Sequence, residues 1–546
     1  MCHDPAVKKW APLTILAAAQ FVMVLDQAVM NVSISQLVDD FDTSVTAIQA
    51  VITLYSLVMA MFMLTGGKIG DIFGRRRAFV IGLVIYGIGS GLTAIAPTVG
   101  VLAFGWSILE GVGAALVLPA LAALIAGNYQ GGDRAVAYSV IGGVAGAGIA
   151  VGPIVGGWAT TELSWRIVFA GEVVLVLAIL ATSRLLSDAA RPGRAPRLDV
   201  IGASLSASGL GLVVLGVLQG SNWGWVRPKH SPVEPFGFSA TPFVIALGGL
   251  LLWAFVAWQH HCEATDRDPL VHLALFRVAA LKSGVQTFLS QNLILMGIFF
   301  TIPLYLQLVL GFDALETGLR MLPVSVAMFV TSAAGSWLSH RVRIRTIVRA
   351  GLVIGAASAF GLVASVDPQL NSTAFGISMA LLGVGMGLIA SQLGNVVQSS
   401  VDESGRSEAG GLQYTAQQLG SALGVALIGA IVITGLVNTF VDDVSSDDRI
   451  SKQTAEQVSI EVNTGASFVA ADDVEDAAEA ADLPPDEVDA IVDHYEDAQI
   501  ESLKAGLLVA ALIALASLGF TKGLPARRAG EPPSGPADTH DSAVAA

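Results

Sequence analysis

Residues 67–77 read Gly67-Lys68-Ile69-Gly70-Asp71-Ile72-Phe73-Gly74-Arg75-Arg76-Arg77. This stretch places five charges and three glycines between two apolar runs, near residues 46–66 and 78–96. Each run has the length of about 20 residues that a helix, rising about 1.5 Å per residue, needs to cross about 30 Å of hydrocarbon. Lys and Arg in short loops stay on the cytoplasmic side of a membrane. The stretch is therefore predicted to form a tight cytoplasmic loop between two membrane helices.

The composition indicates an all-α polytopic membrane protein. Of the 546 residues, 53% are hydrophobic and 13% are charged, which is more apolar than a soluble protein. The net charge of −15 is local, because residues 437–502 contain 19 Asp and Glu against Arg449 and Lys452, a charge of −17 that leaves +2 for the rest. The acidity thus predicts one acidic extracytoplasmic loop and no nucleic-acid partner. Cys2 and Cys262 fall in predicted cytosolic positions, so neither a disulfide nor a metal site is expected.

The hydropathy pattern predicts fourteen membrane spans. They lie near residues 12–33, 46–66, 78–96, 101–126, 136–160, 166–183, 199–219, 241–259, 283–309, 317–339, 346–365, 373–395, 410–436 and 503–521. An even number of spans places both termini on one side of the membrane. Of the 29 Lys and Arg, 22 fall in the segments predicted on that side and seven on the other. We therefore expect a multi-pass protein of the inner or plasma membrane with both termini in the cytoplasm.

The stretch 67–77 also resembles the loop between helices 2 and 3 of the major facilitator superfamily. The pattern Gly67-x-Ile69-Gly70-Asp71-x-x-Gly74-Arg75-Arg76 matches, except that Gly70 stands where alanine is common and Ile72 where arginine is. The resemblance implies a transporter whose loop latches two halves together on the inside. The residues of this latch would be Gly67, Asp71, Gly74, Arg75 and Arg76.

Fourteen spans imply, through the same resemblance, two six-helix bundles with two helices inserted between them. The first bundle is expected in residues 1–183, the inserted helices and their linkers in 184–282, and the second bundle in 283–521. Residues 522–546, rich in Pro, Gly and Ala, predict a disordered cytoplasmic tail. Within the acidic loop, helical spacing predicts two short helices, one at 470–481 and one after Pro484-Pro485 that leads into the last span.

The predicted fifth span carries the pattern Gly148-x-x-x-Gly152-Pro153-x-x-Gly156-Gly157. Small residues four apart let helices approach closely, and a proline bends a membrane helix, so a packing face is one interpretation. The whole pattern also resembles the glycine-proline motif of the family's antiporters on the same helix. Trp165-Arg166-x-x-Phe169 and Pro269-Leu270-x-x-Leu273-x-Leu275-Phe276-Arg277 are similar to fourteen-helix drug:proton antiporters, so the resemblance spans most of the chain.

Three carboxyl side chains fall inside predicted spans of the first bundle: Asp26, Glu110 and Glu172. Ionisable groups inside a membrane are costly, so each is a candidate for function. Counted from the helix ends, all three lie in the outer half of the membrane. The resemblance associates Asp26 with proton coupling and cationic substrates. Glu110 and Glu172 have an alternative interpretation as hydrogen-bonded packing residues.

The fourth span departs from the family. It reads Ser107-x-x-Glu110-Gly111-x-Gly113, where relatives commonly have Arg-x-x-Gln-Gly-x-Gly. No Lys or Arg is therefore predicted beside the three carboxyls, and a buried carboxyl without a counter-ion tends to stay protonated. This suits a proton carrier, but the missing arginine leaves other coupling, or an uncoupled facilitator, open.

The second bundle has amides instead of acids in its spans. In the family fold the first and fourth helices of each half line the cavity, so these amides are candidates for the cavity wall, although amides also tie membrane helices together. With Asn31 of the first span, the predicted cavity residues are Gln291, Asn292, Gln307, Gln392, Asn395 and Gln413.

These features predict a proton-coupled, multidrug-type efflux antiporter of amphiphilic, in part cationic, small molecules. The expected partners are the substrate, protons and the lipid bilayer, with no cofactor, no metal and a monomeric state. Within the superfamily the alternatives are an exporter of one metabolite or lipid and an uncoupled facilitator. An enzyme or a receptor belongs to a different class, and the sequence has no phosphate loop, GxSxG elbow or metal-spaced histidines.

Overall fold

The structure is a computed structural model that describes residues 5–129, 131–187, 197–401, 405–465 and 468–528. In these residues the chain forms helices and no strand. Fourteen helices are long and apolar enough to cross a membrane, and they coincide with the fourteen predicted spans. The prediction of an all-α polytopic membrane protein is confirmed.

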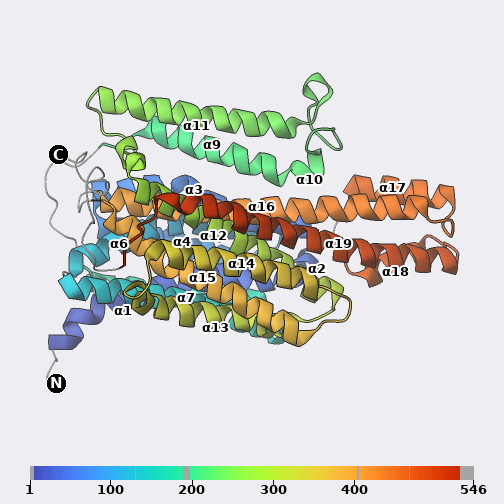
Figure 1. Cartoon of the computed structure of the whole chain (residues 1–546), viewed down its shortest axis with the longest axis horizontal. Coiled ribbons are helices and arrows are strands. Elements are labelled where there is room, and N and C mark those ends of the chain that lie inside the picture. The colour runs from blue at the N-terminus through green and yellow to red at the C-terminus, as the bar shows by residue number, and fades with distance from the viewer. Residues whose placement is uncertain (1–4, 130, 188–196, 402–404, 466–467, 529–546) are drawn as a thin grey trace.

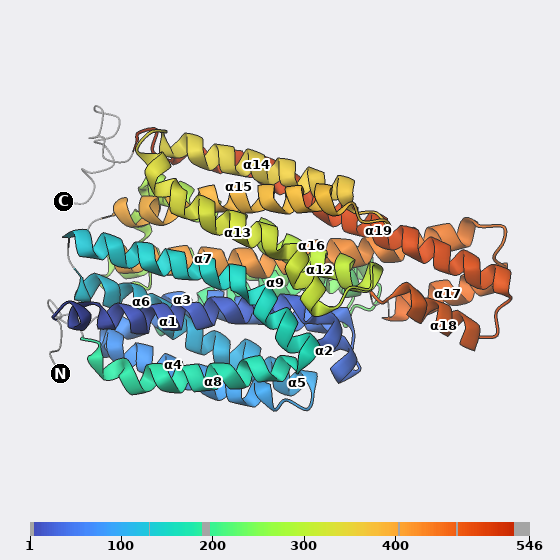
Figure 2. The same cartoon turned by 90° about the horizontal axis from the view of Figure 1, so that it is seen from below.

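The first six spans occupy one side of the helical assembly (Figure 2). They are α1 (Pro5–Val32), α3 (Val45–Phe73), α4 (Arg75–Ala94), the continuous run of α5 (Val99–Leu102), η1 (Ala103–Glu110) and α6 (Gly111–Asn128), then α7 (Gly131–Glu162) and α8 (Trp165–Thr182). The short α2 (Ile34–Phe41) follows α1, and η2 (Ser183–Leu185) follows α8.

The last six spans form the other side. They are α12 (Ala279–Leu304) with η5 (Tyr305–Val309), α13 (Ala314–Ser339), α14 (Ile344–Ser365), α15 (Ser372–Ser399), α16 (Arg406–Ser446) and α19 (Pro485–Ser517), which η6 (Leu518–Gly523) follows. The two sets pack against each other through α7 with α13 and α3 with α16. That the first bundle ends at residue 183 and the second begins at residue 283 remains a proposal.

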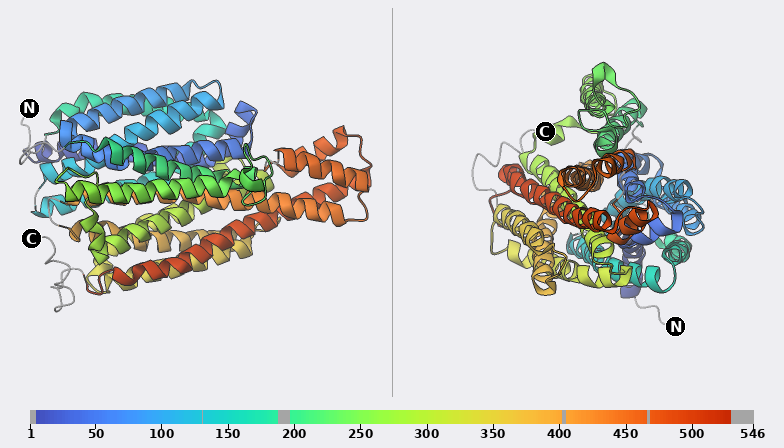
Figure 3. Two further views of the ribbon diagram at one scale, coloured as in Figure 1. Left: turned by 90° about the horizontal axis from the view of Figure 1, so that it is seen from above. Right: turned by 90° about the vertical axis from the view of Figure 1, so that its right-hand side faces the viewer.

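Two helices stand outside the two sets. The helices α9 (Val200–Leu218) and α11 (Ala240–Ala264) pack on each other, and α9 also contacts α3 and α16 (Figure 1). Short elements flank them: α10 (Gly220–Trp223), η3 (Pro235–Gly237) and η4 (Leu273–Arg277). Seen along the helices, the pair projects from one side of the assembly (Figure 3, right). Much of α11 is exposed, as expected for a helix that faces lipid.

The prediction that residues 67–77 form a loop was wrong for most of the stretch. Helix α3 continues through Phe73 and α4 begins at Arg75, so only Gly74 separates the two helices. Gly74 has a φ of 110°, a conformation that side chains with a Cβ rarely adopt, and its N–H donates to the Gly70 carbonyl over 3.0 Å. Lys68 and Asp71 therefore lie on the last turns of α3, and the three arginines lie on the first turn of α4, because the helical backbone hydrogen bonds continue past the apolar runs.

The acidic segment is also more helical than predicted. Helix α16 extends to Ser446 and α19 begins at Pro485, so both continue past their apolar parts. The predicted helices at 470–481 and after Pro484-Pro485 correspond to α18 (Ala471–Ala480) and to the start of α19, whereas α17 (Lys452–Gly465) was not predicted. Together these helices project beyond the spans, at the end opposite the start of α1 and η6 (Figure 2).

The predicted tail is held against the protein where the structure describes it. The N–H groups of Ile344 and Arg345 donate to the carbonyls of Arg527 and Pro525 over 3.2 and 3.1 Å, and Leu524 is buried. Residues 529–546 lie outside the described residues.

Glycines set the closest helix contacts of the first set. A Cβ at Gly113 of α6 would lie 2.7 Å from the Tyr86 backbone nitrogen and 2.8 Å from the Gly82 carbonyl oxygen, both on α4. Real Cβ atoms do not approach backbone atoms so closely, so α4 and α6 pack at this distance only because Gly113 has no side chain.

We expect Gly113→Leu to destabilise the protein by about 1–3 kcal/mol, because the added side chain forces α4 and α6 apart. Gly171→Leu is the matched control, since a Cβ there has no neighbour within 4 Å and helix propensity favours leucine. The measurement is the melting temperature of the purified protein in detergent. Equal melting temperatures of the two variants would contradict the packing account.

The linker between α11 and α12 is tied to helices of both sets. Lys68 of α3 donates its Nζ to the Pro269 carbonyl over 3.1 Å. His272 Nδ1 lies 2.8 Å from Glu408 Oε1 of α16. The backbone N–H of His272 donates to Oε2 of the same carboxylate over 3.2 Å. The hydrogen bond to Glu408 raises the pKa of His272 above its usual value, with Lys68 opposing and Glu263 adding to the effect.

A group whose pKa is raised by folding stabilises the protein fully below its unfolded pKa, about 6.5 for histidine, and loses that contribution as the pH rises through the folded pKa. We therefore expect the melting temperature of the native protein to exceed that of His272→Gln most at pH ~6, with the difference shrinking at pH ~8.5. A difference that grows with pH would show that the charged imidazole does not stabilise this contact.

Candidate functional site

The three membrane-embedded carboxyls meet inside the first set of helices. Asp26 lies on α1, Glu110 on η1 and Glu172 on α8, and one oxygen of each lies within 4.8 Å of the others. Their side chains are 0%, 0% and 1% exposed, so water does not reach them in this conformation. We call these residues the carboxyl cluster.

Hydrogen bonds to the carboxyl cluster come from neutral groups. The Trp106 indole donates to Asp26 Oδ1 over 2.7 Å. The Tyr86 and Ser90 hydroxyls, both on α4, donate to Glu172 Oε2 over 3.2 and 3.1 Å. An indole N–H can only donate a hydrogen bond, so Asp26 Oδ1 must be the acceptor.

Glu110 reaches the cluster from a π-helical turn. The segment η1 interrupts the fourth span, and Glu110 is its last residue. Thr93 of α4 donates to Glu110 Oε1 over 3.4 Å. A Cβ at Gly89 of α4 would lie 2.6 Å from Glu110 Cγ and 2.7 Å from the Gly105 carbonyl oxygen, so glycine makes room for the acid. π-helical turns in spans are often functional, and this one turns Glu110 toward Asp26.

Half of the cluster's oxygens have no partner. Asp26 Oδ2, Glu110 Oε2 and Glu172 Oε1 are buried and accept no hydrogen bond from the described residues. None of the ion pairs in the described part of the chain includes these acids. A buried ionised carboxylate without a partner is strongly disfavoured, so the cluster requires bound protons or another cation.

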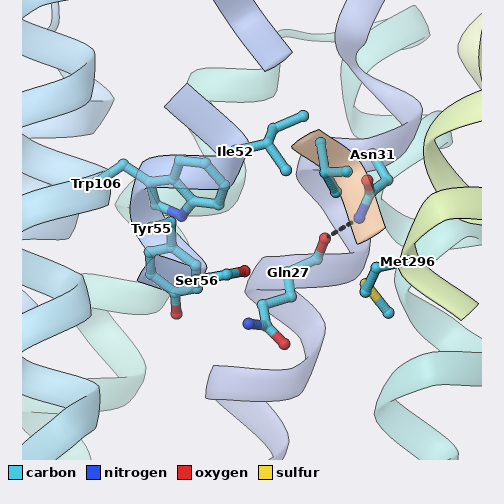
Figure 4. Close-up of a pocket in the computed structure, with 8 residues that line it drawn as sticks. Gln27, Asn31, Ile52, Tyr55, Ser56, Trp106 and Met296 are labelled. Atoms are coloured by element: carbon cyan, nitrogen blue, oxygen red, sulfur yellow. Dashed lines mark hydrogen bonds between the residues drawn. The ribbon is translucent and has the colours of Figure 1, made fainter. Parts of the chain in front are cut away.

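A small cavity lies beside the cluster, between the two sets of helices. Figure 4 shows the side chains around it, which are Gln27, Asn31, Ile52, Tyr55, Ser56, Trp106, Met296 and Val425. Its volume is about 10 Å³, close to the space that one water molecule needs. This cavity is therefore too small to hold a substrate larger than water.

An aromatic pair connects this cavity to the carboxyl cluster. The rings of Tyr55 and Trp106 stack with centroids 4.5 Å apart and planes 1° apart, and both line the cavity. Because the same indole donates to Asp26, one side chain touches both the cavity and the cluster. Sequence reasoning missed Trp106 and Tyr55, since aromatic residues are common in membrane spans and neither carries a charge.

The predicted cavity residues are dispersed in this conformation. Asn31 lines the cavity and donates its Nδ2 to the Gln27 carbonyl over 2.7 Å. Gln307 instead donates to the Val32 carbonyl over 2.9 Å and accepts from the Ser35 hydroxyl over 2.7 Å, so it joins the two sets of helices near one end. Gln307 does not line the small cavity.

The other predicted amides hold helices of the second set. Gln291 and Gln392 donate to the carbonyls of Met386 and Gly335, over 3.0 and 2.9 Å. Asn292 donates to the Phe288 carbonyl of its own helix, Asn395 is exposed, and Gln413 has a buried Oε1 without a partner. Their contribution to a wider cavity in another conformation stays a prediction.

The predicted latch residues contact the first set of helices. Arg75 lies 3.4 Å from Asp71 and donates to the Ala123 carbonyl of α6 over 3.3 Å. Arg76 donates to the Ser183 carbonyl over 3.1 Å. The adjacent Lys68 carries the contact to the linker described above. Gly67 faces Pro119 of α6, where an added Cβ would make an ordinary contact of 3.6 Å with Pro119 Cβ.

The glycine-proline pattern of α7 faces two partners. A Cβ at Gly148 would lie 3.0 Å from Val24 Cγ1 of α1, and a Cβ at Gly156 would lie 2.9 Å from Val29 Cα. Gly152 contacts Ala28, which is also on α1. A Cβ at Gly157 would instead lie 2.8 Å from Leu315 Cα of α13, and Gly318 of α13 contacts the Pro153 carbonyl. The pattern therefore packs α7 on α1 with one face and on the second set of helices with the other.

A comparison with protein families identifies the chain. The family model of the Major Facilitator Superfamily matches residues 16–425, which extend from α1 into α16. The chain belongs to the Major Facilitator Superfamily. The expectation from its motifs is confirmed, and the protein is a multi-pass membrane transporter.

Curated relatives match most of this transporter. It is 33% identical to the puromycin resistance protein pur8 of Streptomyces alboniger over 81% of this chain and 85% of that protein. It is 28% identical to the multidrug efflux pump LfrA of Mycolicibacterium smegmatis over 93% and 95% of the two chains.

Solved transporters share the fold. A bacterial homologue of the human lysosomal transporter Spinster, in an inward-facing and unoccupied conformation, has a TM-score of 0.58 at 14% identity, over 95% of this chain and 98% of that one. A POT peptide transporter in complex with sulfate has a TM-score of 0.57 at 15% identity, over 94% and 96%. The predicted fold of two six-helix bundles with two inserted helices is thus confirmed.

We expect Gly157→Leu to separate α7 from α13, because the new side chain would enter the backbone of the opposing helix. Spin labels attached through Trp158→Cys and Leu319→Cys, in a background without native cysteines, would report this distance by double electron–electron resonance. It should lengthen by several ångströms in Gly157→Leu. In the control Gly142→Leu, on the same helix with no neighbour within 4 Å of a Cβ, it should not change. An unchanged distance in Gly157→Leu would contradict the packing role.

Proposed function

We propose that this transporter exports amphiphilic small molecules, cationic ones among them, from the cell in exchange for protons. The curated relatives support export, since one is described as an antibiotic resistance protein and another as a multidrug efflux pump. On this proposal the transporter lies in the inner or plasma membrane as a monomer. Both termini are cytoplasmic, and α17 and α18 lie outside.

The observation that carries proton coupling is the buried carboxyl cluster. Asp26, Glu110 and Glu172 are enclosed, have no basic partner among the described residues, and each has one oxygen within 4.8 Å of an oxygen of the others. Mutual repulsion and the absence of water favour the neutral form, and the loss of one proton creates a negative charge that a cation can neutralise. Such a site either binds a proton or, after losing it, attracts a cationic substrate. Exchange of protons for substrate requires this alternative.

The route between substrate and proton passes through Trp106. A substrate that enters between the bundles would contact the stacked Tyr55 and Trp106 rings, which attract flat and cationic molecules. Movement of the indole would break its hydrogen bond to Asp26 and expose that carboxyl to the cavity. Water and the positive charge of the substrate would then stabilise the Asp26 carboxylate, and this favours release of the proton from the cluster.

Access to the cavity would alternate between the two sides of the membrane as contacts between the bundles form and break. Gln27 donates to Gln418 over 3.2 Å across the centre, and Gln307 bonds to Val32 and Ser35 toward the proposed outer side. Rocking of the two bundles about this centre would break one set of contacts while another forms. The small cavity fits a closed intermediate of this cycle.

A second candidate is an uncoupled facilitator. Ser107 stands where relatives commonly have an intramembrane arginine, and its hydroxyl donates to the Val51 carbonyl over 2.8 Å. With a neutral residue there, the positive charge of the family's usual coupling relay is absent. Transport that does not respond to a pH gradient would favour this candidate.

The test uses proteoliposomes with an acidic interior and ethidium as the aromatic cation. We expect the native protein to accumulate ethidium as protons leave, and Asp26→Asn to lose this gradient-driven accumulation while keeping ethidium counterflow. Glu110→Gln should change the pH dependence of transport, because it removes one protonation site.

Asp199→Asn is the control, since Asp199 is a buried carboxyl outside the cluster whose oxygens are bonded to Trp258 and Gln259. It should keep gradient-driven accumulation. The proposal fails if the native protein moves ethidium equally with and without the gradient. An unchanged pH dependence of Glu110→Gln would reduce that residue to a packing role.

A further inference from the structure

We propose that the carboxyl cluster, together with the Tyr55 hydroxyl, is a binding site for a dehydrated Na⁺ ion. The proposal concerns what the site binds in the absence of substrate, and it does not rest on export or on proton exchange. It follows from the geometry, the unpartnered oxygens and the charge of the site.

The spacing of the oxygens fits an ion of the size of Na⁺. Three atoms that all lie within 4.8 Å of one another are at most about 2.8 Å from the centre of their triangle. Small side-chain rotations bring this to the range of about 2.3–2.6 Å that oxygen ligands take around Ca²⁺, which has nearly the radius of Na⁺. Mg²⁺ requires a near-ideal octahedral shell of six oxygens at about 2.0–2.1 Å, and the site offers four unpartnered oxygens.

The oxygens that would bind the ion are those that bind nothing else. Asp26 Oδ2, Glu110 Oε2 and Glu172 Oε1 are buried without a hydrogen bond among the described residues, although their partner oxygens accept bonds from Trp106, Thr93, Tyr86 and Ser90. In each carboxyl, hydrogen bonds to one oxygen fix the orientation of the group, and the other oxygen is available to bind an ion. Unsatisfied buried oxygens are rare in folded proteins, and a bound cation is one explanation for them.

Tyr55 is the independent observation that points to a ligand. It belongs to α3, outside the three acidic segments, and its hydroxyl lies beside the Asp26 carboxyl. The side chain is 1% exposed, and the hydroxyl has no hydrogen-bond partner among the described residues. The stacked Trp106 ring holds the Tyr55 ring in place. A buried hydroxyl oxygen beside Asp26 supplies a fourth ligand atom for a cation.

The charge of the site favours a monovalent ion. Asp26 is the acid best prepared to be ionised, because Trp106 Nε1 donates to it at 2.7 Å and cannot accept. One Asp26 carboxylate neutralises one Na⁺, while the two glutamic acids and the tyrosine coordinate as neutral oxygens. Ca²⁺ would require two ionised carboxylates and about six to eight oxygen ligands, more than the four unpartnered oxygens of this site.

The experiment uses the full-length protein, purified in detergent at pH ~8 with choline as the only other cation. Addition of NaCl to about 100 mM should raise the melting temperature by several degrees relative to choline chloride, because an ion that binds only the folded protein stabilises it. It should also change tryptophan fluorescence through Trp106, and Trp106→Phe should remove most of that change. K⁺, Mg²⁺ and Ca²⁺ should have weaker effects.

Variants assign the ion to the site. Asp26→Asn should abolish the Na⁺ response, and Glu110→Gln, Glu172→Gln and Tyr55→Phe should each weaken Na⁺ affinity by about tenfold or more, as expected from the loss of one ligand. Asp199→Asn should respond as the native protein does. Binding of radiolabelled Na⁺ to the native protein, competed by unlabelled Na⁺, gives a readout that does not depend on the variants' stability.

Three results would overturn the proposal. They are an equal response to Na⁺ and choline in the native protein, an unchanged Na⁺ response in Asp26→Asn, and a stronger response to Ca²⁺ than to Na⁺. None of these measurements involves substrate or a pH gradient. The Na⁺ site can therefore fail while proton-coupled export stands, and the reverse also holds.

Discussion

A single hydrogen bond, from the Trp106 indole to Asp26, joins the two parts of the protein that a coupled transporter has to connect. Trp106 lines the space between the bundles, whereas Asp26 belongs to the carboxyl cluster inside the first bundle. Carboxyls enclosed in apolar surroundings are tolerated when they are neutral, hydrogen-bonded or bound to a cation. Because the cluster has no base among its described neighbours, its charge depends on what it binds. A ligand that moves the Trp106 indole therefore changes the surroundings of the Asp26 carboxyl.

The cluster exists because helices of the first bundle pack unusually closely around it. Gly89 leaves room for Glu110, and Gly113 lets α6 approach α4 at the same level. The π-helical turn η1 rotates the start of the fourth span relative to α6, so that Trp106 faces the cavity and Asp26 while Glu110 faces α4. Small residues and one irregular turn thus convert three separate acids into one site.

The contacts between the bundles differ at the two ends of the molecule. At the end near α17 and α18, glycines bring the α7 backbone onto α13, a contact without charge. At the other end, polar contacts of Lys68 and His272 join the linker before α12 to α3 and α16. A rocking motion that opens one end would therefore separate the α7–α13 packing and the Gln307 hydrogen bonds, whereas one that opens the other end would break the contacts of Lys68 and His272. Of the inserted helices, α9 contacts both sets directly, through α3 and α16. Most of α11 faces outward, and it is joined to the two sets mainly by the linker that follows it.

The sequence by itself determined the number, length and order of the membrane spans, because the thickness of the hydrocarbon fixes how long an apolar helix must be. It also identified the family and named the three acids, since charge inside a span is visible in the sequence. It misjudged residues 67–77 and missed α17, because polar residues can continue a helix after the apolar run ends. Only the tertiary structure decided that oxygens of the three acids lie within 4.8 Å of one another, that Trp106 and Tyr55 lie between them and the cavity, and that Gln291 and Gln392 hold helices together. These facts depend on how each helix is rotated about its axis and how closely its neighbours approach, which hydropathy does not encode.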